Sequence, residues 1–237
     1  MDLWVGTSGY SYKEWKGSFY PSALKDAEML GYYAERLPAV EINNTFYRLP
    51  KASVLESWRE QVSAGFRFVL KASRRITHIK RLREAGDETS YLFDTAGVLG
   101  QRLGPILFQL PPNFPKDLSR LQAFLAQIPP GKTATVEFRH ASWFEDDVFE
   151  ALRTHGSALC QSDTDEEPAT RLIRTAPWGY LRLRKEKYTK KQVATWAEKV
   201  GAEDWDSAYV FFKDEGEGHG PKWAQQFLEA AGAPKRP

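Results

Sequence analysis

Short apolar runs recur along the chain, and most of them end in charged or amide residues. Eight runs have the length, the flanking turn residues and the β-branched and aromatic content that are typical of strands. Longer amphipathic stretches separate them, so we expect helices between the strands. The predicted strands are Leu3–Thr7, Ala39–Asn43, Arg67–Lys71, Ile106–Leu110, Thr133–Phe138, Ala158–Ser162, Gly179–Leu183 and Ala208–Phe212.

Between these runs, apolar residues repeat at three- and four-residue spacing, which predicts amphipathic helices. The stripes are Leu24, Ala27, Leu30, Ala34 and Leu37; Leu92, Ala96, Leu99 and Leu103; and Leu118, Leu121, Phe124 and Ile128. Capping boxes, which satisfy free amides at a helix start, are predicted at Ser53–Glu56, Ser142–Glu145 and Thr189–Gln192. Gly156 and Gly201 are predicted to end helices, and Pro168 restricts Glu166–Thr175 to a short helix.

Eight strands that alternate with about eight helices over 237 residues favour a closed (β/α)8 barrel of the TIM type. We expect one domain over residues 1–237, because no linker or low-complexity tract interrupts the pattern. A doubly wound open sheet is the alternative fold. Against it, Gly6-Thr7-Ser8-Gly9 after the first strand does not have the glycine spacing of a dinucleotide-binding turn.

Polar residues at the strand ends share one side of the predicted sheet. Side chains alternate along a strand, so Glu41 and Asn43 face away from Val40 and Ile42, and the same alternation holds for Glu137 and Arg139. Barrel enzymes place their chemistry at the carboxyl ends of the strands. We therefore predict one polar pocket there, to which the other strands contribute Lys71, Gln109, Gln161, Asp163, Arg182, Arg184 and Lys213. The alternative is a salt-bridge network that fills the top layer of the barrel.

Charge suggests what such a pocket would bind. The chain as a whole carries a net charge of only +2, which gives no general attraction to nucleic acid. Within the predicted pocket, cations outnumber acids, and arginine suits phosphate or carboxylate. The inward bases are Lys71, Arg139, Arg182, Arg184 and Lys213, and the inward acids are Glu41, Glu137 and Asp163. We therefore expect an anionic small molecule or nucleic acid as the partner.

Glu41 and Glu137 are the predicted catalytic residues, because two carboxylates in different environments can divide general-acid and general-base roles. Simple ion pairing with Lys71 or Arg139 is an equally good interpretation. No cofactor is predicted. A divalent metal is a weaker alternative, whose ligands would be Glu41, Glu137, Asp163 and His140.

Aromatic residues and two histidines lie near the predicted strand ends. Tyr10 and Tyr47 are candidates for stacking on a base or sugar, with core packing as the alternative. His78 follows the third strand, where it would lie at the mouth or on a solvated loop. His219 precedes the last helix, whose backbone amides would cradle a phosphate unless the loop is merely flexible. The basic run Lys71–Arg83 fits either a phosphate backbone or a solvated face.

Nothing in the sequence indicates a membrane or an oxidising compartment. Residues 1–6 lack the basic and apolar regions of a signal peptide, and no apolar run reaches the ~18 residues that span a bilayer. Cys160 is the single cysteine, and its apolar neighbours predict a buried thiol. We expect a cytoplasmic protein with no membrane partner, and the sequence leaves the oligomeric state open.

Several segments together resemble the YecE-like family, domain-of-unknown-function family 72. They are Gly6–Tyr10, Val40–Tyr47, Phe66–Lys71 with Ile76–His78, Gly104–Pro112, and Val136–His140 with Trp143. The resemblance implies a barrel and brings no settled activity. The chain departs from the family pattern at Arg182-Leu183-Arg184-Lys185, where Arg-Leu-His-Gly is common, and at Phe212-Lys213-Asp214, where Phe-Asn-Asn is common. Its pocket is therefore more basic than is usual in the family.

These observations lead to one hypothesis and one competitor. The hypothesis is an enzyme that acts on an anionic, phosphate-bearing substrate, with nucleic acid among the candidates, by hydrolase- or lyase-like acid/base chemistry at the carboxyl-terminal mouth of the barrel. The competitor is a module that binds nucleic acid or an anionic metabolite without turnover.

Overall fold

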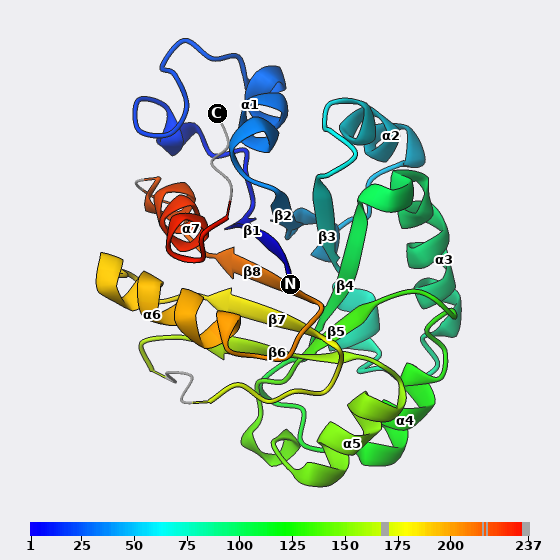
Figure 1. Ribbon diagram of the computed structural model, residues 1–237. Helices are drawn as coiled ribbons and strands as arrows, with labels where there is room; N and C mark the ends of the chain where they lie inside the picture. Colours follow the sequence, from blue (N-terminus) through cyan, green and yellow to red (C-terminus); the bar gives the residue numbers. More distant parts are fainter. Residues whose placement is uncertain (167–170, 215, 217, 234–237) are drawn as a thin grey trace.

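Eight parallel strands close into a barrel in sequence order, with β1 paired to β8 (Figure 1). The computed structural model describes residues 1–166, 171–214, 216 and 218–233. The closed barrel confirms the predicted fold and excludes the open sheet. The strands are β1 (Asp2–Ser8), β2 (Ala39–Ile42), β3 (Arg67–Lys71), β4 (Leu103–Gln109), β5 (Ala134–Glu137), β6 (Ala158–Asp163), β7 (Trp178–Leu183) and β8 (Ser207–Phe212).

Helices surround the barrel and cover the outer faces of the strands (Figure 1). Within the described ranges there are seven α-helices, against the eight or so expected. They are α1 (Met29–Arg36), α2 (Ala52–Glu60), α3 (Gly86–Ala96), α4 (Leu118–Leu125), α5 (Asp146–Thr154), α6 (Lys190–Gly201) and α7 (His219–Ala230). The short helix expected over Glu166–Thr175 falls partly on residues 167–170, outside the described residues, and its flanks are not helical.

The predicted helix boundaries were right at some ends and wrong at others. Thr189 and Gln192 form the expected capping box, and Gly156 takes a left-handed φ of 61° just after α5. Ser142 caps no α-helix, because its hydroxyl accepts the Lys116 amide instead. Gly201 is the last residue of α6 and does not take a left-handed conformation after it, and the C-cap Ala202 is right-handed.

Two further helix predictions were also wrong. Helix α2 begins at Ala52 with Lys51 as its N-cap, two residues before the predicted Ser53 cap. Helix α3 ends at Ala96, and Leu103 of the predicted stripe is the first residue of β4.

The barrel interior has an apolar lower layer. Its members come from six strands and form a cluster separate from the helix-facing core: Ala39, Val69, Leu107, Cys160, Tyr180 and Phe211. Cys160 is buried there, as predicted. Residues two positions further along each strand point inward as well, so this layer identifies which side chains reach the mouth. In the described part of the chain, no helix has the length and apolar content that a membrane span requires.

Candidate active site at the barrel mouth

Arg182 lies at the centre of the mouth and joins the two predicted catalytic carboxylates. Its Nη2 donates to Oε1 of Glu41 on β2 at 2.9 Å, and its Nη1 donates to Oε2 of Glu137 on β5 at 2.6 Å. Both carboxylates have no exposed side-chain surface, and Arg182 is only 3% exposed. The three residues form a buried Glu–Arg–Glu triad, which confirms that strand parity brings Glu41 and Glu137 to the same place.

Glu137 binds two more arginines above this triad. Arg139 Nε lies 3.1 Å from Glu137 Oε1, and Arg184 Nη1 lies 3.3 Å from the same oxygen. Burial on its own would raise the pKa of the Glu137 carboxyl, but the charges of Arg182, Arg139 and Arg184 outweigh it and lower the pKa. Glu137 is therefore a carboxylate at neutral pH.

Glu41 accepts hydrogen bonds from three side chains. Ser8 Oγ donates to its Oε1 at 2.7 Å and Tyr180 Oη donates to its Oε2 at 2.6 Å, in addition to the Arg182 bond. Burial, followed by the Glu41 charge, raises the pKa of the Tyr180 phenol, so Tyr180 remains a donor. Carboxylates held by several donors in this way keep their arginine partners in a fixed orientation. Proton transfer by Glu41 and Glu137 stays a prediction, and the contacts favour the ion-pairing alternative.

Lys71, at the end of β3, differs from the arginines of the mouth. Its Nζ lies 4.4 Å from the centre of the Phe46 ring, and within the described residues no carboxylate lies at ion-pairing distance from it. Partial burial, and next the charge of Arg182, lower the pKa of Lys71 to about 8; Glu41 and Glu137 oppose this shift. A substantial fraction of neutral amine is therefore present near physiological pH.

His78 lies against the same aromatic ring. It belongs to a short π-helix, η4 (Arg75–Ile79), and its imidazole stands edge to face with Phe46 at 4.9 Å between ring centres. Its Nδ1 is 2.9 Å from Thr77 Oγ1. Burial, followed by the charges of Lys71 and Arg81, lowers the pKa of His78, so that the imidazole is neutral at pH 7. The sequence left His78 between the mouth and a solvated loop, and the shared ring joins it to Lys71.

Three other predicted residues occupy the expected ends of their strands. Gln109 is in register with Glu137, so the two share the inner face. Lys213 follows β8, and its amide donates to the carbonyl of Leu183. Asn43 follows β2 and is half-buried, and its Oδ1 has no hydrogen-bond partner in the described structure.

The predicted inward positions on β6 were wrong. Ser162 pairs with Arg182 in the sheet and faces inward, so Gln161 and Asp163 face the helices. Asp163 Oδ2 accepts from Tyr188 Oη at 3.0 Å and from Trp196 Nε1 of α6 at 3.3 Å. Gln161 Oε1 accepts a backbone amide of the β6–β7 connection. Both side chains therefore have partners on the outer side of the barrel and do not reach the mouth, although Gln161 Nε2 is buried without a partner in the described structure.

The two predicted stacking tyrosines have different surroundings. The Tyr10 ring packs on Tyr33 of α1, with 6.2 Å between ring centres, which corresponds to the core-packing alternative. Tyr47 is 73% exposed and stands edge to face with Phe46 at 5.1 Å. Of the two, only Tyr47 adjoins a ring that contacts a charged group of the mouth.

Sequence reasoning missed the hydroxyl groups that complete the site. Ser8 and Tyr180 both bind Glu41, but the sequence places Ser8 just beyond its predicted strand and Tyr180 within an apolar run.

Three further buried polar atoms of the mouth have no partner in the described structure: Ser162 Oγ and the Nε atoms of Arg182 and Arg184. Buried polar atoms of this kind commonly bond to water or a ligand.

The predicted metal ligands do not converge. Glu41 and Glu137 are engaged by arginine, Asp163 faces α6, and His140 Nδ1 bonds to Ser142 Oγ at 2.8 Å. Across residues 1–166, 171–214, 216 and 218–233, no group of three or more His, Cys, Asp or Glu side chains is arranged to hold a metal ion. The weaker metal hypothesis therefore has no ligand set in the described structure.

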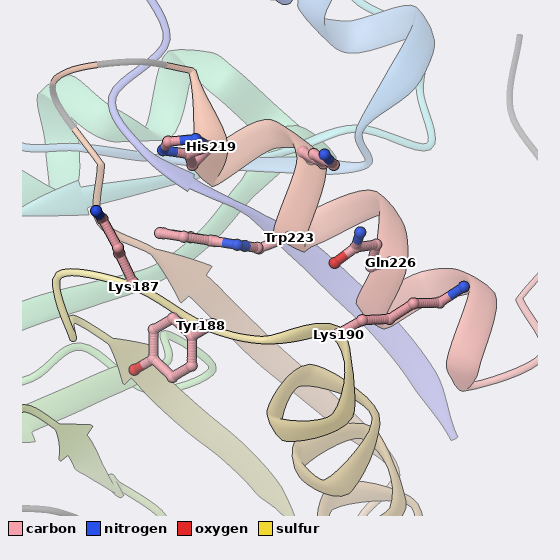
Figure 2. Close-up of a pocket in the computed structure, with 7 residues that line it drawn as sticks. Lys187, Tyr188, Lys190, His219, Trp223 and Gln226 are labelled. Atoms are coloured by element: carbon pink, nitrogen blue, oxygen red, sulfur yellow. The ribbon is translucent and has the colours of Figure 1, made fainter.

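A second basic feature lies beside the mouth, between the starts of α6 and α7. It is a cavity of about 500 Å³, which we call the α6–α7 cavity, and no acidic side chain is among its described lining residues (Figure 2). Figure 2 shows Trp223 between His219 and Tyr188; its ring is stacked with His219 at 5.6 Å and edge-on to Tyr188 at 5.4 Å. The lining residues are Lys187, Tyr188, Lys190, His219, Lys222, Trp223 and Gln226.

The basic run Lys71–Arg83 is partly neutralised within the protein. Glu88 of α3 binds Arg75 Nε at 2.7 Å and Lys80 Nζ at 2.8 Å. Arg81 donates to the side chain of Asn113 at 3.2 Å. These contacts favour the solvated-face interpretation of the run over a track for a phosphate backbone.

Comparison with known proteins places the chain in a family context. The model of DUF72, described as a protein of unknown function, matches residues 4–237. UPF0759 protein YecE of Escherichia coli K12 is 33% identical over 143 residues, which is 60% of this chain and 50% of that protein. UPF0759 protein YunF of Bacillus subtilis is 27% identical over 160 residues, 62% of this chain and 54% of that protein. The matched region thus spans about half the length of these curated relatives.

Solved structures show the same architecture. The crystal structure of a DUF72 family protein from Thermotoga maritima is 26% identical and superposes with a TM-score of 0.83, covering 97% of this chain and 98% of that one. A methyltransferase from Methanosarcina mazei, at 12% identity and a TM-score of 0.53, is similar in fold alone.

Proposed function

The chain belongs to the DUF72 family, and from the geometry of its barrel mouth we propose that it is an enzyme for an anionic, phosphate-bearing substrate. The substrate binds at the carboxyl ends of the strands and is transformed by acid/base chemistry. In this proposal the arginines hold the anion, while Lys71 and His78 transfer protons. Glu41 and Glu137 keep the arginines in place.

The observation that carries this proposal is the excess of positive charge around the triad. Four cationic side chains, Lys71, Arg139, Arg182 and Arg184, face two carboxylates. Arg182 is enclosed, but Arg139 and Arg184 keep 22% and 18% of their side-chain surface exposed. An incoming anion can therefore reach these two guanidinium groups, and a site that is poor in water strengthens the attraction.

Thermal stabilisation by phosphate compounds tests the proposal. A ligand that binds only the native state raises the melting temperature in proportion to its concentration and affinity. We expect inorganic phosphate, pyrophosphate and phosphorylated sugars to raise the melting temperature at low salt. We expect the double variant Arg139→Met/Arg184→Met to lose most of that shift, and high salt to weaken it.

The matched control is a double variant at the other basic feature, Lys190→Met/Lys222→Met, which removes the same number of positive charges. It should keep the wild-type response to phosphate if the anion binds at the mouth. No response of the wild-type protein to any of these compounds at low salt would contradict the proposal. An equal loss of response in both double variants would show a nonspecific charge effect and also contradict it.

A second candidate function is binding of an anionic metabolite or nucleic acid without turnover. The observation that favours it is the α6–α7 cavity, in which three lysines and a histidine line the space and no acidic residue of the described lining balances them. Its position after β7 and β8 is a frequent phosphate site in barrels of this type.

The same two double variants distinguish this candidate. If the cavity is the main anion site, Lys190→Met/Lys222→Met removes the thermal shift and Arg139→Met/Arg184→Met retains it. A single-stranded oligonucleotide then serves as the nucleic-acid probe. Its affinity should fall steeply as salt rises if the lysines neutralise several phosphates, and stay undetectable if the cavity takes only a small molecule.

A further inference from the structure

Lys71 has the surroundings of a nucleophilic amine. It ends a barrel strand and faces inward. The charges that act on it are those of Arg182 on β7, Arg184 just after β7, Glu41 on β2 and Glu137 on β5. The two carboxylates that could neutralise it are engaged by Ser8, Tyr180 and the arginines. Its ammonium instead lies on the Phe46 face. A desolvated amine beside other cations is the arrangement that activates lysine toward carbonyl carbons.

The segment that follows Lys71 is strained. It contains the π-helix η4, and π-helical turns occur often at functional sites. Just beyond it, Arg81, Leu82 and Glu84 take φ values of 47°, 67° and 48°, in the left-handed region that non-glycine residues avoid. Strain of this kind clusters at active sites, where the surrounding structure holds it for a purpose. His78 of this segment lies against the ring that also contacts Lys71.

We propose that Lys71 forms an imine with the carbonyl carbon of an anionic ketone or aldehyde bound at the mouth. The proposal rests on the proposed function, since the mouth arginines would hold the phosphate or carboxylate of the same molecule. It narrows the substrate class to short carbonyl compounds that carry such a group, and the reaction type to lyase- or isomerase-like chemistry through an iminium ion.

The covalent step is balanced without an oxidant or reductant. The neutral amine of Lys71 adds its electron pair to the carbonyl carbon, the C–N bond forms as the C=O π bond breaks, and the oxygen takes up a proton. Loss of that oxygen as water, with a second proton, leaves a protonated imine. Overall, ammonium and carbonyl give iminium and one water molecule. The iminium then withdraws electrons, so that a neighbouring C–H or C–C bond is more easily broken.

His78 is placed to transfer these protons. The Thr77 hydroxyl also lies 3.3 Å from the carbonyl of Ser73. In the tautomer that lets it donate there, the Nδ1–H of His78 donates to Thr77 Oγ1 and Nε2 keeps its lone pair. Within the described residues no group is bonded to that Nε2. A neutral imidazole with a free lone pair accepts a proton from the adduct and returns it to the leaving hydroxyl.

Borohydride trapping tests the proposal on the whole chain. The protein is incubated at about pH 8 with pyruvate or dihydroxyacetone phosphate and then reduced with sodium borohydride, which converts an imine to a stable amine. The modified lysine gains the mass of the carbonyl compound less one oxygen atom. We expect peptide mapping to find Lys71 labelled about tenfold faster than any other lysine, because far more of its amine is neutral at this pH.

Four variants give the trapping experiment its controls. Lys71→Arg keeps the charge and cannot form an imine, so labelling at this site should disappear while the thermal shift with phosphate remains. Lys132→Met, at an exposed position before β5, should label like the wild-type protein. His78→Gln should slow trapping about tenfold or more without changing the thermal shift. Arg139→Met, which removes an anion-holding charge that does not act on the pKa of Lys71, should lower trapping of both anionic probes and leave the slow trapping of neutral acetone unchanged.

The possible outcomes distinguish failure of the imine proposal from failure of the proposed anion site. If phosphate stabilises the protein and Lys71 is not trapped preferentially, the imine is excluded and the proposed anion site stands. If labelling persists on the protein at the wild-type rate in Lys71→Arg, another lysine is responsible and the proposal is wrong. If neither stabilisation nor trapping occurs, the proposed function fails together with the imine.

Discussion

The cations on two sides of the barrel mouth have opposite electrostatic surroundings. On the side of β5 and β7, Arg182 is 3% exposed and is bonded to two fully buried carboxylates. On the side of β3, Lys71 lies over Phe46 and, in the described part of the chain, has no carboxylate at ion-pairing distance. The neighbouring carboxylates are already saturated by other donors.

This difference suggests that Arg182 stabilises the fold and that Lys71 takes part in the chemistry. Arg182 offsets two buried negative charges, so removing it leaves them unpaired. The positive charge of Lys71 is opposed by burial and by the arginines, so the protein holds it at an energetic disadvantage. Residues kept in an unfavourable state are the ones that function requires. The same kind of substitution, cation to methionine, should therefore have opposite effects on stability at the two positions.

The largest expected effect is that of Arg182→Met. The substitution keeps much of the side-chain volume and leaves Glu41 and Glu137 buried without their shared partner. We expect the free energy of unfolding to fall by about 3–5 kcal/mol, as measured by chemical denaturation. Partial protonation of the carboxyl groups would reduce the loss at lower pH.

An exposed arginine provides the control for this variant. Arg174 pairs with Asp204 at 2.8 Å, but the two side chains are 46% and 96% exposed. We expect Arg174→Met to change stability by no more than about 0.5 kcal/mol. If Arg182→Met were equally mild, the triad would not be the structural centre of the mouth.

Glu137→Gln should have the next largest effect, with a characteristic pH dependence. The pKa of Glu137 is lowered in the folded protein, so its carboxylate contributes stability above the unfolded-state pKa of about 4.3, and this is lost as pH falls through the folded pKa. At pH 7 we expect a loss of about 3 kcal/mol, because three arginines lose their shared partner. Denaturation at a series of pH values should show the gap between the two proteins closing below about pH 4.

A stable but inactive Glu137→Gln protein would point to a catalytic role for Glu137. A Glu137→Gln protein with wild-type stability that still binds phosphate and loses activity by about 10²-fold or more would return Glu137 to the catalytic role expected from its sequence. A destabilised variant whose folded fraction is fully active would confine it to positioning the arginines.

Strand parity was enough to predict the barrel and the centre of the mouth. Glu41, Glu137 and Arg182 alternate with apolar residues that face the helices, so alternation places their side chains inside. The helix-facing residues are Val40 and Ile42, Val136, and Leu181 and Leu183. On β6 the inward residues Ala158 and Cys160 are apolar too. Polarity therefore does not distinguish the two faces of that strand, and Asp163 and Gln161 were placed on the wrong one.

The contacts of the mouth were harder to predict than its members. Tyr180 and Arg182 reach Glu41 across 139 and 141 residues of sequence. Such bonds depend on the closure of the barrel and the stagger of its strands, which local pattern does not contain. The absence, among the described residues, of a carboxylate partner for Lys71 was also not predictable from local pattern. It depends on the other side chains that bind Glu41 and Glu137.

The measurement that tests this account most directly is the stability of Lys71→Met across pH. The folded pKa of about 8 lies below the unfolded value, so the native state disfavours the ammonium. The disadvantage is fully present below about pH 8 and disappears as pH rises toward about 10.4, where both states are neutral. The shift in pKa corresponds to a destabilisation of roughly 3 kcal/mol. Partial solvation of the amine reduces this figure, and the variant also loses the Phe46 contact, so the expected net gain in stability is about 1 kcal/mol.

We therefore expect Lys71→Met to unfold at higher denaturant concentration than the wild-type protein at pH 7, by about 1 kcal/mol, with the gap closing above about pH 10. Glu41, Glu137, Arg182, Arg184 and His78 are unchanged in both proteins, so the difference reports on Lys71 alone. Exposed Lys190→Met serves as the control and should show no such trend. A Lys71→Met protein that is less stable than the wild type at pH 7 by about 2 kcal/mol or more, as expected for a paired buried cation, would contradict the account.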